Sequence, residues 1–372
     1  MDALVTDAHI PSAVSGIRAL GRTGLAVAAL APHRSAAGLW SRYSASGTVA
    51  PDSVADPDGF VAAVQRVVAR HGRLVVYPGQ DEALNALLAA SLPADATLPY
   101  PGPEPLAALR DKSRLAGLAT DAGLATPSTL ASGAADELLS ADLPDGAVVK
   151  PSQPGGAFAE VRLADSRDEL RAVLATVPPD EEVVLQERLS GRLMAMSVVV
   201  DRDGGLARRF QQMALRTWPP DAGISSLAVS VDPDEALAEA CRALLAAAGY
   251  WGLAQLQFIG AQGGRRLIDV NTRFYGSLAL ALAAGVNLPA AWHAVTLDRL
   301  VGAPEPYRAG VSYRWLEADA MAAMRGIRGR LFARGPRPRT GPMWARDDLS
   351  ASAVFAAAAV GGGIRRRLSR RA

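Results

Sequence analysis

Short apolar runs and stretches of helix-like apolar periodicity alternate along the first 108 residues. Runs predict strands and periodic stretches predict helices, in the order strand 3–6, helix 12–20, strand 26–30, helix 60–70 and strand 74–77. Alternation of this kind is typical of a parallel sheet covered by helices. The first strand-to-helix turn, residues 7–12, lacks the glycine spacing that lets a backbone approach a pyrophosphate. This argues against a Rossmann-type oxidoreductase.

The pattern changes after the proline-rich segment 99–105, where we expect a domain boundary. Beyond it, the pattern predicts helices and strands in chain order: helix 111–122, strand 148–151, helix 168–176, strands 183–187, 196–200 and 206–211, helix 234–248, strands 253–259 and 265–270, and a helix from 277. Glycine-containing turns join 196–200 to 206–211 and 253–259 to 265–270, so each pair is expected to be an antiparallel hairpin.

Composition adds an informative asymmetry, because only Lys112 and Lys150 are lysines among the 39 basic residues. Arginine occupies nearly every position where a solvated positive charge suffices, so the two lysines are candidates for sites that need a compact ammonium. Lys112 opens a predicted helix, and Lys150 ends an apolar strand just before a loop with proline and glycine. Together they predict a nucleotide phosphate site. An ordinary surface lysine remains a reasonable interpretation for Lys112 alone.

A second candidate site lies in the last predicted strand pair. Residues two apart share a face of a strand, so Asp269, Asn271 and Arg273 are expected to point the same way, with Gln257 facing them from the neighbouring strand. Amide and carboxylate oxygens suit a hard cation such as Mg²⁺, which is usually shared with substrate phosphates. A solvent-facing polar edge is the alternative, but the apolar flanks indicate a buried strand, where such groups must be paired.

These motifs, taken in order, resemble those of the ATP-grasp superfamily over roughly residues 108–292. The matching segments are Asp111-Lys112, Val148 to Pro151 (VVKP), Leu185 to Gly191 (LQERLSG) and Leu267 to Ser277 (LIDVNTRFYGS). Within that superfamily the chain looks most like stand-alone carboligase-like proteins of the carboxylate-amine ligase type, found in biosynthetic gene clusters and related to biotin carboxylase and carbamoyl-phosphate synthetase. Those proteins share segments similar to 215–220 and 283–289.

The resemblance implies an α/β fold in three parts. Residues 1–108 would form the parallel-sheet α/β domain that precedes the grasp fold. Residues 109–305 would form a two-lobed ATP-grasp domain with α+β lobes and a phosphate-loop lid at about 144–185. Residues 306–372 would form a helical, arginine-rich C-terminal segment.

The resemblance also implies a nucleotide site for ATP. Lys112 and Lys150 would contact its phosphates, beneath a loop in which Gly155 and Gly156 permit close backbone approach. The adenine slot would be lined by three residues of the interlobe segment: Gln186, Glu187 and Leu189.

For the reaction, the resemblance implies that Gln257, Asp269 and Asn271 hold Mg²⁺, or alternatively Mn²⁺. Arg273 and Arg216 would neutralise charge on the transferring phosphoryl group. The implied activity is an ADP-forming carboxylate-amine ligase, in which ATP activates a small-molecule carboxylate as an acyl-phosphate that an amine then attacks. Phosphoryl transfer depends mainly on positioning and charge neutralisation, so no covalent nucleophile is required.

Three departures from the superfamily pattern keep other functions open. Asp269 stands where glutamate is usual, Gln257 occupies a position that is more often glutamate, and Met194 falls near the place of a ribose-binding acid. A nucleotide-binding pseudoenzyme or regulatory protein is therefore an alternative. A ligase whose acceptor is not an amine, such as a thiol or a carbamate, is another.

The net charge of +2 conceals a basic C-terminal part, because residues from 325 onward contain twelve arginines and only two acids. A packed helix is the commoner interpretation of the apolar stripe in 315–334. Peripheral membrane contact is the alternative, since 351–360 is apolar and the arginines of 365–371 could meet anionic lipid. The sequence contains no basic segment with interleaved aromatic residues, so it does not predict binding to nucleic acid.

The N-terminus lacks the pattern of a signal peptide, and no apolar run reaches the roughly 18 residues that span a bilayer. We therefore expect a cytoplasmic protein. The alternative is a cytoplasmic protein in peripheral contact with the inner face of the membrane. A homodimer is common in the superfamily and is expected here on that ground alone.

Overall fold

The computed structural model describes residues 1–152, 158, 161–219, 223–261, 264–324 and 338–368. The chain divides into two compact units, each made of segments distant in sequence. Unit 1 comprises Met1–Tyr100, Arg273–Leu316 and Arg334–Ala372, and unit 2 comprises Pro101–Thr272 and Glu317–Ala333. The three-part division at 108 and 305 stays a prediction.

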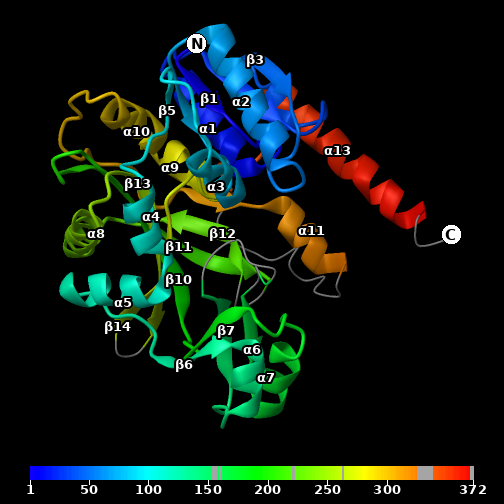
Figure 1. Cartoon of the computed structure of the whole chain (residues 1–372). Coiled ribbons are helices and arrows are strands. Elements are labelled where there is room, and N and C mark those ends of the chain that lie inside the picture. The colour runs from blue at the N-terminus through cyan, green and yellow to red at the C-terminus, as the bar shows by residue number, and fades with distance from the viewer. Residues whose placement is uncertain (153–157, 159–160, 220–222, 262–263, 325–337, 369–372) are drawn as a thin grey trace. The chain divides into compact units, whose positions relative to one another are not determined.

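Unit 1 is built on a five-stranded parallel sheet with the order β3-β2-β1-β4-β5 (Figure 1). Its strands are β1 (Ala3–Val5), β2 (Val27–Ala31), β3 (Ser44–Val49), β4 (Leu74–Tyr77) and β5 (Ala96–Thr97). The short strand β15 (Ser312–Arg314) also belongs to unit 1 but is not part of this parallel sheet. Its helices are α1 (Pro11–Gly21), η1 (Ala37–Trp40), α2 (Pro57–His71), α3 (Asp81–Ala89), α9 (Leu278–Ala284), α10 (Leu288–Thr296) and α13 (Leu349–Leu368). Every residue of β1, β2 and β4 is buried, as the continuous apolar runs of a parallel sheet require. The predicted N-terminal parallel sheet is confirmed.

The later segment of unit 1 packs against its first helix. Helix α1 contacts both α9 and α10, and the ring of Phe274 occupies the space that a side chain at Gly16 would need. Trp292 is fully buried and meets the ring of Tyr77, at the end of β4, edge-on at a centroid distance of 5.0 Å. An aromatic cluster therefore joins residues after 273 to the N-terminal sheet.

Unit 2 contains two antiparallel sheets, of order β6-β9-β7-β8 and β14-β13-β10-β11-β12. Its strands are β6 (Thr129–Ala134), β7 (Ala147–Pro151), β8 (Arg162–Ala164), β9 (Glu182–Gln186), β10 (Arg192–Val200), β11 (Leu206–Trp218), β12 (Ile224–Ser230), β13 (Gly252–Ala261) and β14 (Gly264–Asn271). Its helices are α4 (Pro103–Arg110), α5 (Lys112–Asp121), α6 (Ala135–Ser140), α7 (Arg167–Leu174), α8 (Glu235–Ala247) and α11 (Leu316–Met324). Helices α6 and α7 share a core with the smaller sheet, and α8 packs against β10 and β11 of the larger one. The α/β class with antiparallel lobes is confirmed.

In the described part of the chain, no single helix is long and apolar enough to cross a membrane. The pair α9 and α10, bent by 100° at the break between them, meets the length and composition requirement only when taken together.

Candidate functional site

The two lysines of the chain converge on one strand of unit 2, β14. Lys112 is the first residue of α5, and its Nζ donates a 2.8 Å hydrogen bond to Oδ1 of Asp269. The side chain of Asp111 accepts hydrogen bonds from two backbone amides of the first helical turn, which fixes where the helix begins. Lys150 comes from β7, and its Nζ donates to the carbonyl oxygen of Ile268 at 3.3 Å. The structure thus brings together the two residues that composition singled out.

A β-bulge accounts for the contact at Ile268. In the β13–β14 ladder, Gln257 lies opposite Asp269 and Phe258 lies opposite Leu267, so Ile268 is the extra residue between them. A bulge interrupts the ladder locally and re-aims the groups around it. The carbonyl oxygen of this extra residue accepts the hydrogen bond from Lys150.

The surroundings of Lys150 favour an anionic ligand. The residue is 8% exposed. Burial, and secondly the positive charge of Lys112, lower the pKa of the Lys150 ammonium to about 8, while Asp269 opposes the shift. Two ammonium groups and one carboxylate leave excess positive charge, which a polyphosphate chain would balance. Gly155 and Gly156, expected to cover the phosphates, lie outside the described residues.

Four side chains with oxygen donors form an array on one face of the β13–β14 pair. The register sets Gln257 opposite Asp269 and Gln255 opposite Asn271, and alternate residues of a strand share a face. The Nε2 of Gln257 donates to Oε1 of Gln255 at 3.3 Å. Three of the four residues were predicted from the sequence as metal ligands, and Gln255 was not. The available signal was its position two residues before Gln257 on the same predicted strand.

The donor chemistry of this oxygen array (Gln255, Gln257, Asp269 and Asn271) fits a hard divalent cation that keeps part of its own shell. Mg²⁺ commonly takes one or two carboxylates and completes its coordination with water and phosphate oxygens. Across the described residues, no group of three or more His, Cys, Asp and Glu side chains is placed to hold a metal ion. The array therefore suits a cation that arrives with a polyphosphate better than one held by the protein alone.

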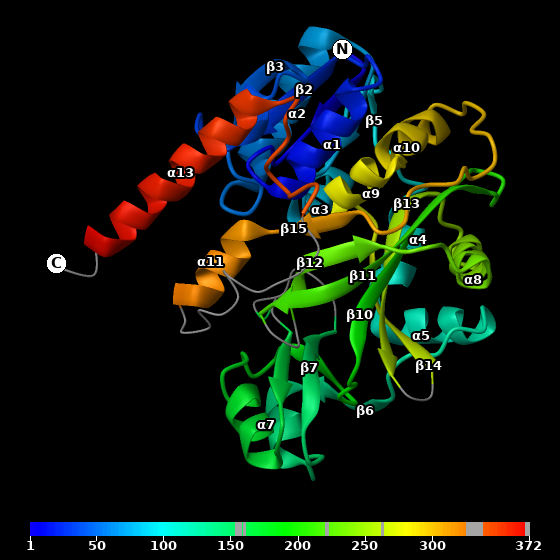
Figure 2. The same cartoon turned by 180° about the vertical axis from the view of Figure 1, so that it is seen from behind.

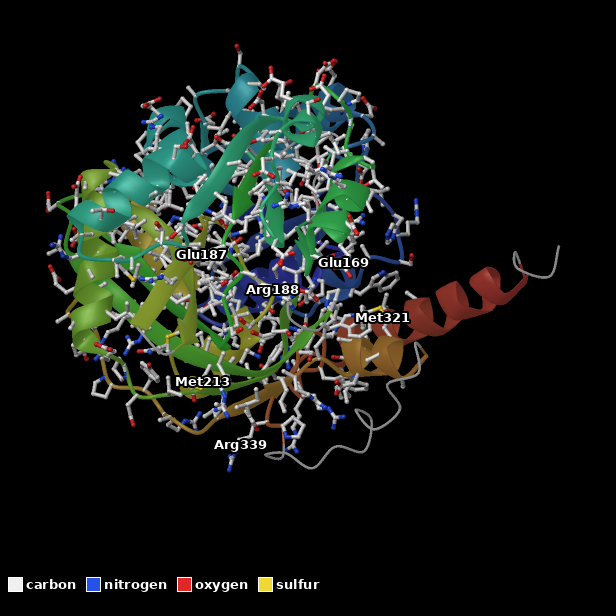
Figure 3. All side chains as sticks on the ribbon, turned by 90° about the horizontal axis from the view of Figure 1, so that it is seen from below. Glu169, Glu187, Arg188, Met213, Met321 and Arg339 are labelled. Carbon is white, nitrogen blue, oxygen red and sulfur yellow. The ribbon has the colours of Figure 1, made fainter. Side chains whose placement is uncertain are left out.

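The residues expected around adenine lie at the end of β9 and just after it. Gln186 is 6% exposed, and its buried Oε1 has no hydrogen-bond partner among the described residues. An unmatched buried acceptor costs free energy unless a ligand donor satisfies it, so this oxygen suits an amino group. Glu187 (Figure 3) instead accepts a 3.0 Å hydrogen bond from the amide of Ser128 and lies 3.9 Å from Nε of Arg266. Leu189 is half-buried.

The two arginines expected at the phosphoryl group belong to different units. β14 ends at Asn271, so the expectation that Arg273 continues the same strand face is wrong. In unit 1, Nε of Arg273 donates a 2.7 Å hydrogen bond to Oδ2 of Asp81, the first residue of α3. In unit 2, Arg216 on β11 forms a 3.0 Å ion pair with Asp319, which is fully buried. A carboxylate therefore orients each guanidinium.

A family comparison covers the part of the chain from β9 to the first turn of α11. Residues 181–319 match the sequence profile of a family described as ATP-grasp in the biosynthetic pathway with Ter operon. No curated protein matches the chain.

Solved structures share the fold at low sequence identity. The ADP complex of purK, N5-carboxyaminoimidazole ribonucleotide synthetase, has a TM-score of 0.64 at 15% identity, over 88% of this chain and 84% of that chain. The biotin carboxylase–βγ-ATP complex from Campylobacter jejuni has a TM-score of 0.61 at 14% identity, over 84% and 74%. An L-amino acid ligase from Bacillus licheniformis has a TM-score of 0.59 at 17% identity, over 80% and 74%. Each of these proteins has the same fold as this chain.

Proposed function

We propose that this chain is a member of the ATP-grasp superfamily and an ADP-forming ligase that uses MgATP to join a carboxylate to an amine. The observation that carries the proposal is the convergence of Lys112 and Lys150 on β14, beside the oxygen array. One structure with the same fold is named an L-amino acid ligase, which supports the choice of an amine as acceptor.

The lysines would bind the phosphate chain of ATP. Phosphate oxygens would place negative charge beside the buried ammonium of Lys150. They would thereby raise the pKa of this ammonium from about 8. Lys112 would exchange its contact with Asp269 for phosphate oxygens, which releases that carboxylate. The buried Oε1 of Gln186 would accept a hydrogen bond from the adenine amino group.

The oxygen array would hold Mg²⁺, and Mn²⁺ suits the same ligands. When bound, the cation supplies neutralisation of charge at the polyphosphate. Asp269 carries the only negative charge of the four side chains, so it would contribute most to that binding.

The reaction would have two displacement steps. First, a carboxylate oxygen of one substrate forms a bond to the γ-phosphorus of ATP while the bond to ADP breaks, giving an acyl-phosphate. Second, the amine nitrogen attacks the acyl carbon, the bond to phosphate breaks, and the amine loses a proton to solvent. Arg273, oriented by Asp81, and Arg216, oriented by Asp319, would neutralise charge in these steps. Positioning and charge neutralisation account for most of such catalysis.

One observation favours a second candidate, a pseudoenzyme that binds nucleotide without turnover. The oxygen array holds a single carboxylate, which is at the low end for a site that must retain its cation through a reaction. A ligase with a thiol or carbamate acceptor is compatible with the same site, because the array and the lysines make no contact that selects an acceptor.

The test is release of ADP and phosphate from MgATP with pooled small-molecule carboxylates, in the presence of hydroxylamine. Hydroxylamine traps any acyl-phosphate as a hydroxamate, so the first step becomes visible whatever the natural acceptor is. Lys150→Ala and Asp269→Asn are expected to lose hydroxamate formation, while Arg114→Gln, an exposed change two residues after Lys112, is expected to keep it. MgATP binding without turnover in any pool would favour the pseudoenzyme, and absence of MgATP binding would refute both.

The homodimer, the lack of nucleic-acid binding and the cytoplasmic location stay predictions. Equilibrium sedimentation of the purified chain measures the first of them directly.

A further inference from the structure

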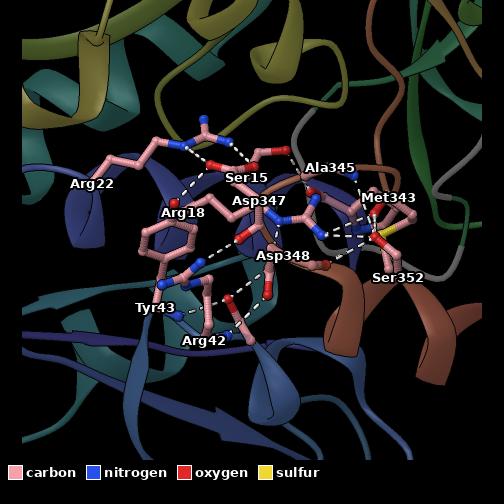
Figure 4. Close-up of polar contacts among 12 residues, drawn as sticks. Ser15, Arg18, Arg22, Arg42, Tyr43, Met343, Ala345, Asp347, Asp348 and Ser352 are labelled. Atoms are coloured by element: carbon pink, nitrogen blue, oxygen red, sulfur yellow. Dashed lines mark hydrogen bonds and ion pairs between the residues drawn. The ribbon is translucent and has the colours of Figure 1, made fainter.

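Within unit 1, a network of ion pairs and hydrogen bonds fixes the start of α13 to the segment Met1–Tyr100 (Figure 4). Asp348 is 1% exposed and accepts hydrogen bonds from Nε of Arg18 at 2.7 Å and from Oγ of Ser41 at 2.8 Å. Asp347 accepts a 2.9 Å hydrogen bond from Nε of Arg22. The helix begins at the next residue, so contacts with the segment Met1–Tyr100 set where it starts. We call residues 343–352 the anchor.

Apolar packing continues the anchor for about one further turn. Val14 of α1 and Ala37 of η1 form a buried cluster with residues of the anchor, and Phe355 packs against this cluster. Ala357 and Ala358, which follow, are exposed. Helix α13 nevertheless continues to Leu368, which at 1.5 Å per residue is roughly 20 Å beyond Phe355. Figures 1 and 2 show it leading away from the sheet of unit 1 in both views.

The sequence of this projecting helix is sharply divided. Residues 353–364, the apolar segment, contain no polar side chain. Residues 365–367, the arginine cluster, are three consecutive arginines, and no acidic residue occurs from 349 onward. Three consecutive glycines, 361–363, disfavour a helix in water because glycine loses the most backbone freedom on ordering. An apolar environment favours the helix instead, because unpaired backbone groups are costly there.

We propose that α13 docks unit 1 onto an anionic lipid surface. The apolar segment would enter the headgroup boundary, and the arginine cluster would bind the negatively charged headgroups. Twelve residues of helix extend about 18 Å, well short of the roughly 30 Å hydrocarbon core, so the segment lies in the interface and does not span.

Two features of unit 1 agree with a lipid partner. Trp344, in the anchor, is 53% exposed, and Trp40, at the end of η1 against which α13 packs, is 54% exposed. Tryptophan is enriched where one end of a side chain meets apolar surface and the other meets water. A parallel pairing of two copies of α13 would set arginine cluster against arginine cluster, which disfavours that arrangement of a second copy.

The test is flotation of the full chain with vesicles of phosphatidylcholine alone and of phosphatidylcholine with phosphatidylserine, at low and high salt. Binding is expected only to the anionic vesicles and is expected to weaken at high salt. The variant R365Q/R366Q/R367Q is expected to bind about 100-fold more weakly, at roughly fivefold per arginine. The variant I364D, which places a charge in the apolar segment, is expected to lose binding as well.

The matched control is R66Q/R70Q/R73Q, which replaces three exposed arginines, two in α2 and one just after it. This variant is expected to bind like the wild type. Equal melting temperatures of all variants establish that each one folds. Three outcomes would overturn the proposal: no binding to anionic vesicles, equal loss in the control, or equal binding to phosphatidylcholine alone. If the wild type forms a dimer by mass, I364D abolishes that dimer and neither protein binds vesicles, then α13 packs against a second copy of the chain.

Discussion

The Nζ of Lys112 lies 2.8 Å from Oδ1 of Asp269, so the first residue of α5 neutralises the one carboxylate of the oxygen array. Each partner is thereby held ready for a stronger ligand: the ammonium for a phosphate and the carboxylate for a cation. Binding either ligand frees the other partner. The proposed site should therefore take up nucleotide and Mg²⁺ cooperatively.

The substitution Asp269→Asn tests this cooperativity. It removes the negative charge that the cation needs and releases Lys112, so ADP affinity without Mg²⁺ should be retained or increased. The tightening of ADP binding by Mg²⁺ should disappear, and turnover should fall about 100-fold or more. Gln257→Glu is the converse variant and should raise the apparent Mg²⁺ affinity about tenfold by adding a carboxylate. Calorimetric titrations with and without Mg²⁺ measure both, and full Mg²⁺ dependence in Asp269→Asn would contradict the account.

Lys150 should make stability depend on alkaline pH in a definite direction. Burial, aided by Lys112, lowers its pKa from 10.5 to about 8, so between these values the unfolded chain binds a proton that the folded chain does not. The free energy of unfolding should therefore rise with pH across this window, by roughly 3 kcal/mol from this group. Below pH 8 both states are protonated and the penalty of the buried charge is present in full.

Urea unfolding of the wild type and of Lys150→Met, at several pH values across that window, isolates the effect. All other titrating groups are common to the two proteins, so the difference between their free energies of unfolding reports on Lys150 alone. This difference should shrink as pH rises. A pH-independent difference would show that Lys150 does not titrate as its burial requires.

Asp81 should act as a positioning residue for Arg273. Its carboxylate accepts a 2.7 Å hydrogen bond from Nε of the arginine, 192 positions away in sequence. Asp81→Asn should lower kcat of the hydroxamate reaction about tenfold by loosening the guanidinium, with KM for ATP nearly unchanged. Asp81→Glu should restore most of the rate. A loss confined to KM would place the effect in nucleotide binding instead.

Two adjacent aspartates of the anchor should differ greatly in their effect on stability. Asp348→Ala leaves the 3% exposed Arg18 without its buried partner, which should cost about 3–5 kcal/mol. Asp347→Ala breaks a pair whose side chains are 34% and 43% exposed, which should cost about 1 kcal/mol or less. Denaturant unfolding of both variants measures this contrast, and similar losses would refute the assignment of Asp348 as the buried support.

Local patterns were sufficient for strands with a continuous apolar run and for helices with apolar residues at helical spacing. The strands β1 and β4 and the helix α2 follow from their own sequences, because their buried positions are all apolar. Helix α1 was also predicted, although it buries Ser12, Ser15 and Arg18. β3 was missed because it reads Ser-Ala-Ser-Gly-Thr-Val and gains its stability from pairing with β2. α4 was missed because its first residue, Pro103, also suits a rigid linker, although proline is favoured in the first turn of a helix.

Some features of the candidate site could likewise be predicted from the sequence, and others could not. Lys112, Lys150 and Asp269 could be selected from composition and from the period of a strand. The bulge at Ile268 could not, because a one-residue shift of register leaves no mark in either strand alone. The contact between Asp81 and Arg273 could not be foreseen either, since it depends on the fold of unit 1, which brings α3 to Arg273.

The central claim is that Lys112 and Lys150 form the phosphate site. Its most direct test is calorimetric titration of ADP with Mg²⁺ into three proteins: wild type, Lys150→Met and Arg114→Met. The claim predicts that Lys150→Met binds at least tenfold more weakly near neutral pH, as loss of a charge-assisted phosphate contact requires, while the exposed Arg114→Met binds like the wild type. It also predicts that wild-type affinity falls above pH 8, where Lys150 loses its proton, and that Lys150→Met shows no such fall. Unchanged affinity in Lys150→Met would contradict the claim that the two lysines form the phosphate site.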